Sequence, residues 1–155
     1  KMKKINIEPI IQSVVDDYNS IYKVKKDIKI NYENDGKKEY FINGIENRIE
    51  QMIANLLDNS ISFTEKGGKI IVNISITSNR KIKVKIIDEG QGFKEKDTSK
   101  IFRRFYSNRP DKFGEHSGLG LNIVKNLVEL HDGKIVASNR PNNKGAIMEI
   151  SFQSI

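Results

Sequence analysis

Apolar and polar residues follow two distinct periods along this chain. Apolar side chains recur every three or four positions between residues 10 and 21, and again between residues 45 and 63, which predicts two amphipathic helices. Residues 69–77 and 81–87 alternate between apolar and polar, which predicts two strands joined in an antiparallel hairpin by Ser78-Asn79-Arg80. Helices and antiparallel strands are therefore expected to combine in one fold.

The other segments complete the expected architecture. Apolar spacing predicts a third helix at residues 119–130. Shorter strands are predicted at residues 5–7, 28–32, 40–42, 134–138 and 146–152. Helices that cover one face of a sheet make a two-layer sandwich. The sequence therefore predicts an α+β fold with a mixed, mostly antiparallel sheet and about three helices on one face, in a single domain over residues 1–155.

Residues 88–117 follow neither period. They are rich in charged residues and contain an aromatic cluster at Phe102, Phe105 and Tyr106. A stretch of this length without regular elements is uncommon in a compact domain, and it is typical of a functional lid or of a disordered segment.

Composition excludes several classes of function. The chain has no cysteine, which excludes a disulfide scaffold, a thiol nucleophile and a cysteine-based zinc site. Its net charge of +7 fits phosphate or nucleic-acid binding, but the lysines are dispersed, and we favour solvated surface charge. No apolar run is long enough to span a membrane, and no signal peptide is present. Because the chain begins Lys1-Met2, we expect it to be a piece of a longer protein.

Two asparagines on the helix predicted at 45–63 are candidates for metal binding. Asn55 and Asn59 are four residues apart and therefore share one helix face. Their amide oxygens suit Mg²⁺, which also takes phosphate oxygens from a nucleotide. The alternative is that both are solvated or capping residues.

A second candidate follows the strand predicted at 81–87, in the segment Asp88-Glu89-Gly90-Gln91-Gly92-Phe93. The Asp88 carboxylate can accept a hydrogen bond from an exocyclic amine such as that of adenine. Gly90 and Gly92 allow close approach of the backbone to a ligand. The alternative is an ordinary turn without a ligand.

A third candidate is Ser117-Gly118-Leu119-Gly120-Leu121, which opens the helix predicted at 119–130. Backbone N–H groups at a helix N-terminus bind phosphate, and the helix dipole favours its negative charge. The chain contains no Walker A segment, and no third glycine follows Gly118 and Gly120, so two other phosphate loops are excluded.

The order of these motifs carries a family resemblance. The helix with Asn55-Leu56-Leu57-Asp58-Asn59 precedes the hairpin, the Asp88 segment, the stretch Ile101–Tyr106 and the glycine-opened helix. This order resembles the N, G1, F and G2 boxes of the ATP-binding catalytic domain of sensor histidine kinases, in the superfamily that includes gyrase, Hsp90 and MutL. Residues 105–118 further resemble the ChvG/ExoS-type envelope sensor kinases.

The resemblance implies the Bergerat (GHKL) ATP-binding fold and a role for each motif residue. Asn59 would coordinate Mg²⁺ with Asn55 beside it, and Asp88 would bind the adenine amine. Ser60 departs from the family pattern, which usually has an alanine there. Residues 93–116 would form an ATP lid, in which Arg104 and Arg109 are candidates for contacting phosphate and Arg104 is also a candidate catalytic residue, as is Asn55. The other implied nucleotide contacts are Phe63 and Phe93 near the base, Gly90 and Gly92 in the passing chain, and the N–H groups of Ser117, Gly118, Leu119, Gly120 and Leu121.

The resemblance also implies partners. The domain would bind Mg-ATP or Mg-ADP and pass the γ-phosphoryl group to a histidine on an upstream dimerisation domain that this chain lacks. A response regulator would act downstream, and no nucleic acid would be bound. The domain would be the cytoplasmic part of an inner-membrane sensor, with membrane contact only through the rest of that protein.

Three other functions remain open from the sequence. A superfamily ATPase would use a glutamate on the N-box helix to activate water, but Asn55 stands at the similar position, and an amide cannot take a proton. A stand-alone anti-sigma serine kinase also tends to have an acidic residue there. A nucleic-acid-binding module would instead use the net charge of +7.

Overall fold

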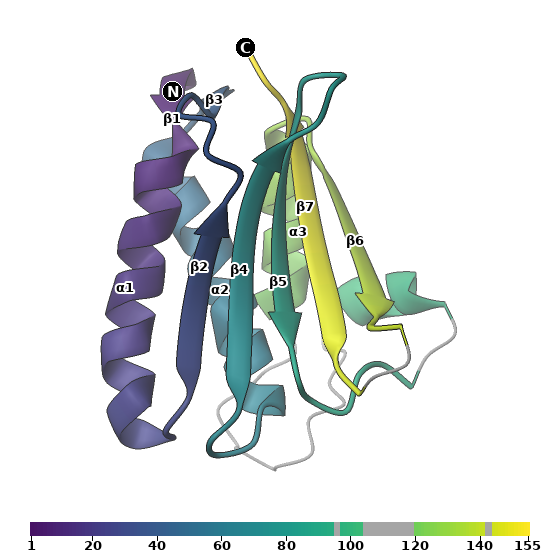
Figure 1. The fold of residues 1–155 in the computed structure, drawn as a ribbon. Coiled ribbons are helices and arrows are strands. Elements are labelled where there is room, and N and C mark those ends of the chain that lie inside the picture. The colour runs from purple at the N-terminus through teal and green to yellow at the C-terminus, as the bar shows by residue number, and fades with distance from the viewer. Residues whose placement is uncertain (95–96, 104–119, 142–143) are drawn as a thin grey trace.

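The computed structural model describes residues 1–94, 97–103, 120–141 and 144–155. Strands and helices follow one another along the chain, and Figure 1 shows their arrangement. In chain order they are β1 (Lys3–Asn6), α1 (Ile7–Lys25), β2 (Lys29–Asn34), β3 (Phe41–Gly44), α2 (Glu46–Phe63), β4 (Lys69–Ile76), β5 (Lys81–Asp88), the 3₁₀ helix η1 (Thr98–Phe102), α3 (Gly120–Leu130), β6 (Lys134–Asn139) and β7 (Ala146–Gln153).

The main sheet has five strands in the order β2-β4-β5-β7-β6. The β2–β4 pair is parallel, and the other three pairs are antiparallel. The helices α1, α2 and α3 lie on one side of this sheet, as Figure 1 shows. The predicted α+β sandwich, with a mixed sheet and three helices, is confirmed.

Alternation along the strands decides which sheet face meets the helices. On β4 the buried positions are Ile70, Val72 and Ile74, and β5 follows the same rule over residues 82, 84 and 86. The facing surface of α2 contributes Leu56 and Leu57, both fully buried. Since apolar burial is the main stabilising contribution to folding, this interface between the helices and the sheet is the core of the domain.

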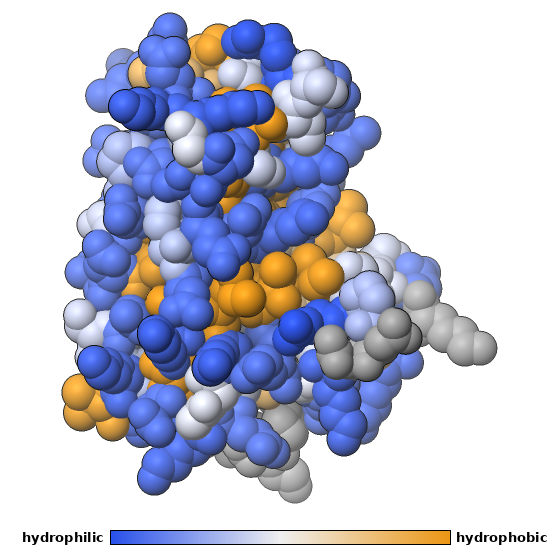
Figure 2. Space-filling model, viewed as in Figure 1, coloured by the Kyte–Doolittle hydropathy of each residue, from blue (hydrophilic) through white to orange (hydrophobic). Residues whose placement is uncertain are grey.

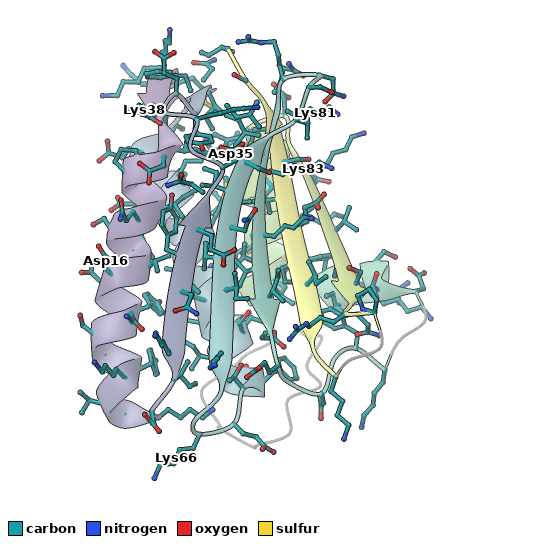
Figure 3. All side chains as sticks on the ribbon, viewed as in Figure 1. Asp16, Asp35, Lys38, Lys66, Lys81 and Lys83 are labelled. Atoms are coloured by element: carbon teal, nitrogen blue, oxygen red, sulfur yellow. The ribbon has the colours of Figure 1, made fainter. Side chains whose placement is uncertain are left out.

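The other face of the sheet is open and largely polar. Lys81 and Lys83 project from it near the start of β5 (Figure 3), and Lys83 Nζ lies 3.8 Å from a carboxylate oxygen of Glu149. Figure 2 shows an apolar band across this mostly hydrophilic face. Strand register aligns Ile71, Ile87 and Ile147 in one row across it. Because helices cover only one face of the sheet, apolar and polar residues alternate along its strands.

Two of the differences between the predicted elements and the structure have a clear physical cause. The strand predicted at 5–7 ends at Asn6, because the Asn6 side chain accepts a hydrogen bond from the Glu8 N–H and starts α1 at Ile7. This strand, β1, pairs with β3 in a separate two-stranded sheet. Residues 98–102, predicted to lack regular structure, form η1, since the Asp97 side chain accepts from the Ser99 N–H and caps its start.

His131 joins the ends of two helices. The N-cap of α2 is Ile45, which has no side-chain hydrogen-bonding group, and its backbone N–H donates to His131 Nε2 at 3.1 Å. The other ring nitrogen, Nδ1, lies 2.8 Å from the Leu127 carbonyl oxygen and donates to it. Both ring nitrogens are therefore used inside the fold, which gives His131 a structural role.

Candidate functional site

Two of the predicted motifs meet at one end of the main sheet, and the described part of α3 begins at the same end. The end of α2, the end of β5 and the start of α3 all lie at the lower end of the sheet in Figure 1. The backbone of Gly90, just after β5, packs directly on Phe63 at the end of α2. The packing of α2 against β5 and against α3 brings these distant segments together, so the site depends on the tertiary fold.

Asp88, the last residue of β5, is held with one carboxylate oxygen paired and the other unpaired. Its side chain is only 1% exposed. Oδ1 accepts from the Gly90 N–H at 2.9 Å and from the Ala146 N–H at 3.1 Å, whereas Oδ2 is buried and has no hydrogen-bond partner. A buried acceptor without a partner is costly, so Oδ2 is suited to receive a donor from a ligand.

The electrostatics of Asp88 have opposing causes. Burial raises the pKa of the carboxyl above its usual value, because the charged form loses hydration. The N–H groups of Gly90 and Ala146 and the nearby Arg140 guanidinium lower the pKa, since each favours the charged form. Burial prevails in this balance, and the carboxylate therefore sits in a dry environment where a hydrogen bond to a ligand is strong.

The two glycines after Asp88 each have a packing reason. A Cβ atom on Gly90 would overlap the Phe63 carbonyl oxygen, and a Cβ on Gly92 would lie 2.6 Å from Asn139 Oδ1. Gly92 also has a φ of +76°, which favours glycine. Because neither glycine has a side chain, the loop after β5 packs closely against α2 on one side and against β6 on the other.

The α2 residues lie on the last three turns of the helix. Asn59 is 4% exposed, while Asn55 and Phe63 are half-buried. The Asn59 backbone oxygen accepts a hydrogen bond from the Ser62 hydroxyl at 2.7 Å. The amide oxygens of Asn55 and Asn59 are hard ligands of the kind that fit Mg²⁺.

The start of α3 is described only from Gly120 onward. Gly120 is the first helical residue, and Leu121 packs against the core. Asn122 donates from its side chain to the Phe102 carbonyl oxygen at 3.1 Å and so joins α3 to η1. The other predicted contacts of this region lie outside the described residues: Arg104, Arg109, Ser117, Gly118 and Leu119.

Several residues that contact the predicted site residues were not predicted from the sequence. Ala146 supplies an N–H to Asp88, and the Arg140 guanidinium donates to the Asp88 backbone oxygen at 3.4 Å. The Asn139 side chain makes two hydrogen bonds to the Phe93 backbone: it accepts from the N–H group at 2.6 Å and donates to the carbonyl oxygen at 3.0 Å. These contacts depend on the pairing of β5 with β7 and of β7 with β6, which a local motif cannot predict.

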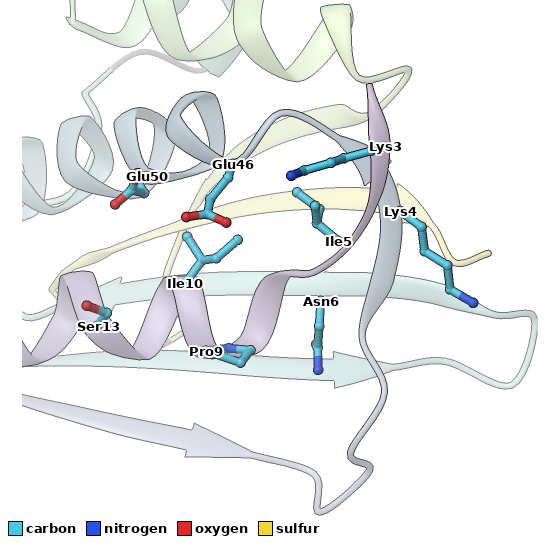
Figure 4. A pocket seen from close by; sticks show the side chains of 9 residues that line it. All are labelled: Lys3, Lys4, Ile5, Asn6, Pro9, Ile10, Ser13, Glu46 and Glu50. Atoms are coloured by element: carbon cyan, nitrogen blue, oxygen red, sulfur yellow. The ribbon is translucent and has the colours of Figure 1, made fainter. Parts of the chain in front are cut away.

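One pocket of the structure lies away from these motifs. It has a volume of about 480 Å³ and lies between β1 and the starts of α1 and α2 (Figure 4). Its charged side chains, Lys3, Lys4, Glu46 and Glu50, are all exposed to solvent. Two ammonium groups and two carboxylates balance one another there, and we assign no function to this pocket.

Two negative observations apply to the described parts of the chain. They contain no group of three or more histidine, cysteine or acidic side chains placed to hold a metal ion. None of their helices combines the length and the apolar character needed to span a lipid bilayer.

Comparisons with known proteins agree with the geometry. A family model described as histidine kinase-, DNA gyrase B- and HSP90-like ATPase matches residues 44–154. The sensor protein ChvG of Agrobacterium fabrum is 35% identical across 96% of this chain, which corresponds to 26% of that protein. The chain thus spans about a quarter of the length of the ChvG relatives it matches. The predicted likeness to ChvG is confirmed.

Solved structures show the same fold. The catalytic domain of the histidine kinase ThkA, in a nucleotide-free form, is 26% identical with a TM-score of 0.84, covering 99% of this chain and 96% of that one. ThkA in complex with the response regulator protein TrrA matches at 24% identity and a TM-score of 0.81, covering 99% of this chain and 42% of that one.

The motif order, the two-layer fold and the family match agree with one another. ATP binding follows from that family. The chain therefore belongs to the histidine kinase-, DNA gyrase B- and HSP90-like ATPase family and, within it, to the catalytic, ATP-binding domains of sensor histidine kinases.

Proposed function

We propose that this domain binds Mg-ATP at the lower end of its sheet and donates the γ-phosphoryl group to a histidine on a separate dimerisation domain of the same protein. The observation that carries the proposal is the buried, unpaired Oδ2 atom of Asp88. Two backbone N–H groups fix the carboxylate, so Oδ2 is preoriented to accept from the exocyclic amine of adenine. Phe63, half-buried next to Gly90, offers an aromatic surface for the base, and Phe93 would lie nearby.

The phosphate groups would lie between α2 and the start of α3. Asn55 and Asn59 are the residues that would hold Mg²⁺, and the bound ion would neutralise charge on the phosphate oxygens. Backbone N–H groups at the start of α3, from Gly118 to Leu121, would bind phosphate at a helix N-terminus. Arg104 and Arg109 are the proposed cationic contacts from the lid.

The transfer step needs positioning more than covalent chemistry by this domain. A neutral imidazole nitrogen of the acceptor attacks the γ-phosphorus, the bond to the bridging oxygen breaks, and ADP leaves. His131 is unsuited as the acceptor, because both of its ring nitrogens are used inside the fold. We place the acceptor histidine on an upstream dimerisation domain.

The proposed setting is a two-component pathway. The complex of ThkA with a response regulator supports a response regulator as the downstream partner of this chain. The domain itself would lie on the cytoplasmic side of an inner-membrane sensor, and only other parts of that protein would meet the membrane. Hydrolytic or serine-kinase activity is disfavoured because the Asn55 amide cannot act as a general base.

Nucleotide titration followed by a transfer assay tests this proposal. We expect the chain to bind Mg-ADP in calorimetry, to gain thermal stability with it, and to gain none with DNA or RNA. Incubated alone with labelled Mg-ATP, the chain should stay unlabelled, and label should appear on a histidine only when the dimerisation domain of the same protein is added. Label on the isolated chain, or stabilisation by nucleic acid alone, would contradict the proposal.

Replacing Asn59 with alanine should remove the Mg²⁺ dependence of nucleotide binding. Loss even of an outer-shell partner of a metal weakens its binding about 10-fold or more, and a direct ligand should matter at least as much. We expect Mg²⁺ to strengthen ADP binding in the unmodified chain but not in Asn59→Ala, as measured by calorimetry with and without chelator. Asn73→Ala, on the β4 strand away from α2, is the control and should retain the Mg²⁺ effect.

A further inference from the structure

Two buried polar atoms lack a hydrogen-bond partner among the residues that the structure describes. They are Asp88 Oδ2 and the hydroxyl oxygen of Ser60, on a side chain that is 0% exposed. Native proteins leave few such atoms, because each costs the hydration that it loses on burial. Asp88 has a proposed role in the nucleotide site, whereas Ser60 has none.

The hydroxyl of Ser60 differs from its neighbours on the same helix end. The Ser62 hydroxyl donates to the Asn59 backbone oxygen, and the Thr64 hydroxyl donates to the Ser60 backbone oxygen, both at 2.7 Å. Serine and threonine on helices commonly satisfy themselves in this way. The Ser60 hydroxyl makes no such bond, so the helix does not account for this polar atom.

The side chains of Ser60 and Asp88 lie close to one another. Ser60 lies one turn before Phe63, whose carbonyl group contacts the loop directly after Asp88. The Ser60 hydroxyl makes no hydrogen bond of good geometry with the carboxylate, but it lies close enough to favour the charged form and so to oppose the rise in the pKa of Asp88 that burial causes. Two buried polar atoms that lie close together and lack hydrogen-bond partners are placed to share one polar partner.

We propose that Ser60 determines base specificity in the nucleotide site, where its hydroxyl and Asp88 Oδ2 together bind the polar edge of an aminopurine, directly or through one ordered water. This inference rests on the proposed function. A carboxylate only accepts hydrogen bonds, whereas a hydroxyl donates as well as accepts. An exocyclic amine beside an acceptor ring nitrogen presents the complementary pair, with the amine for Asp88 and the ring nitrogen for Ser60.

Analogues of ADP that lack one ring nitrogen test the pairing. The probes are Mg-ADP and its 1-deaza and 7-deaza forms, in which a C–H group replaces the ring nitrogen on either side of the amine. We expect Ser60→Ala to weaken Mg-ADP binding about fivefold, the usual effect of losing one hydrogen bond. In the unmodified chain one of the deaza forms should show a similar loss, and that loss should disappear in Ser60→Ala, since both changes remove the same interaction.

Controls separate this inference from structural effects and from the proposed function. Ser60→Cys keeps the side-chain size, removes the strong donor and should bind as Ser60→Ala does. Thr64→Val removes a neighbouring buried hydroxyl whose bond lies inside the helix, and it should keep the loss seen with the deaza form. The proposal is wrong if Ser60→Ala binds Mg-ADP as tightly as the unmodified chain does. It is also wrong if Ser60→Ala still shows the full loss of affinity for the deaza analogue. If the unmodified chain binds no Mg-ADP, the proposed function fails first.

Discussion

Asp88→Asn should weaken Mg-ADP binding by about 100-fold while leaving the domain folded. Asparagine keeps an acceptor for the N–H groups of Gly90 and Ala146, which hold Asp88 Oδ1 at 2.9 and 3.1 Å. It places an NH₂ group where Oδ2 now lies, so two donors would face each other at the base. Losing a charge-assisted hydrogen bond and leaving a buried donor unpaired together cost about 3 kcal/mol or more. Calorimetric titration of Mg-ADP measures the loss, and the melting temperature reports on the fold.

Glu89→Gln is the matched control for this variant. Glu89 is the adjacent acidic residue, and its Oε1 atom accepts from the Lys69 N–H at 2.9 Å. The same change from acid to amide, one position along the chain, should leave Mg-ADP affinity nearly unchanged, because Glu89 is exposed and bonded to β4. If both variants bind equally well, Asp88 is not the base-reading residue.

Gly145→Ala should be the most destabilising small substitution near the site. Gly145 has a φ of +140°, and a Cβ atom there would overlap the Asp88 backbone oxygen and lie 2.8 Å from Arg140 Cδ. Backbone strain and the steric overlap together should cost about 3 kcal/mol. For a domain of this length that corresponds to a drop of about 6 to 12 °C in melting temperature. Thermal unfolding followed by circular dichroism measures it.

Gly36→Ala separates strain from overlap. Gly36 also has a positive φ, at +80°, but a Cβ atom there would meet no atom within 4 Å. This control should lose only about 1 kcal/mol, the cost of the left-handed conformation for an alanine. An equal drop in melting temperature for both variants would mean that packing against Asp88 does not matter.

Local patterns predicted the elements of this fold well. The stripe of α2 and the alternation of β4 and β5 are strong because each element buries one face only. The separate β1–β3 pair was not predicted, because a four-residue strand carries no sign of which strand it will pair with. The short helix η1 was also missed, since it depends on one capping residue, Asp97, rather than on a repeated pattern.

The sequence indicated the motif residues of the candidate site, but not the residues that hold them in place by hydrogen bonds. Asn59, Asp88 and Gly90 are visible in the sequence because polar and glycine residues interrupt apolar segments there. Asn139 and Ala146 contribute through backbone-directed hydrogen bonds to residues more than 40 positions away. Such partners become identifiable only when strand order and register are known, and neither residue type is unusual in its local context.

The parallel pairing of β2 with β4 has a consequence for folding kinetics. Lys29 pairs with Lys69, so β3 and the whole of α2 lie within the stretch of chain that this pairing closes. Such long-range closure is slow and comes late, because chain entropy is lost before the contacts form. A ligand that binds only the native arrangement is expected to slow unfolding and to leave the rate of folding almost unchanged, so Mg-ADP should act mainly on the unfolding rate of this domain.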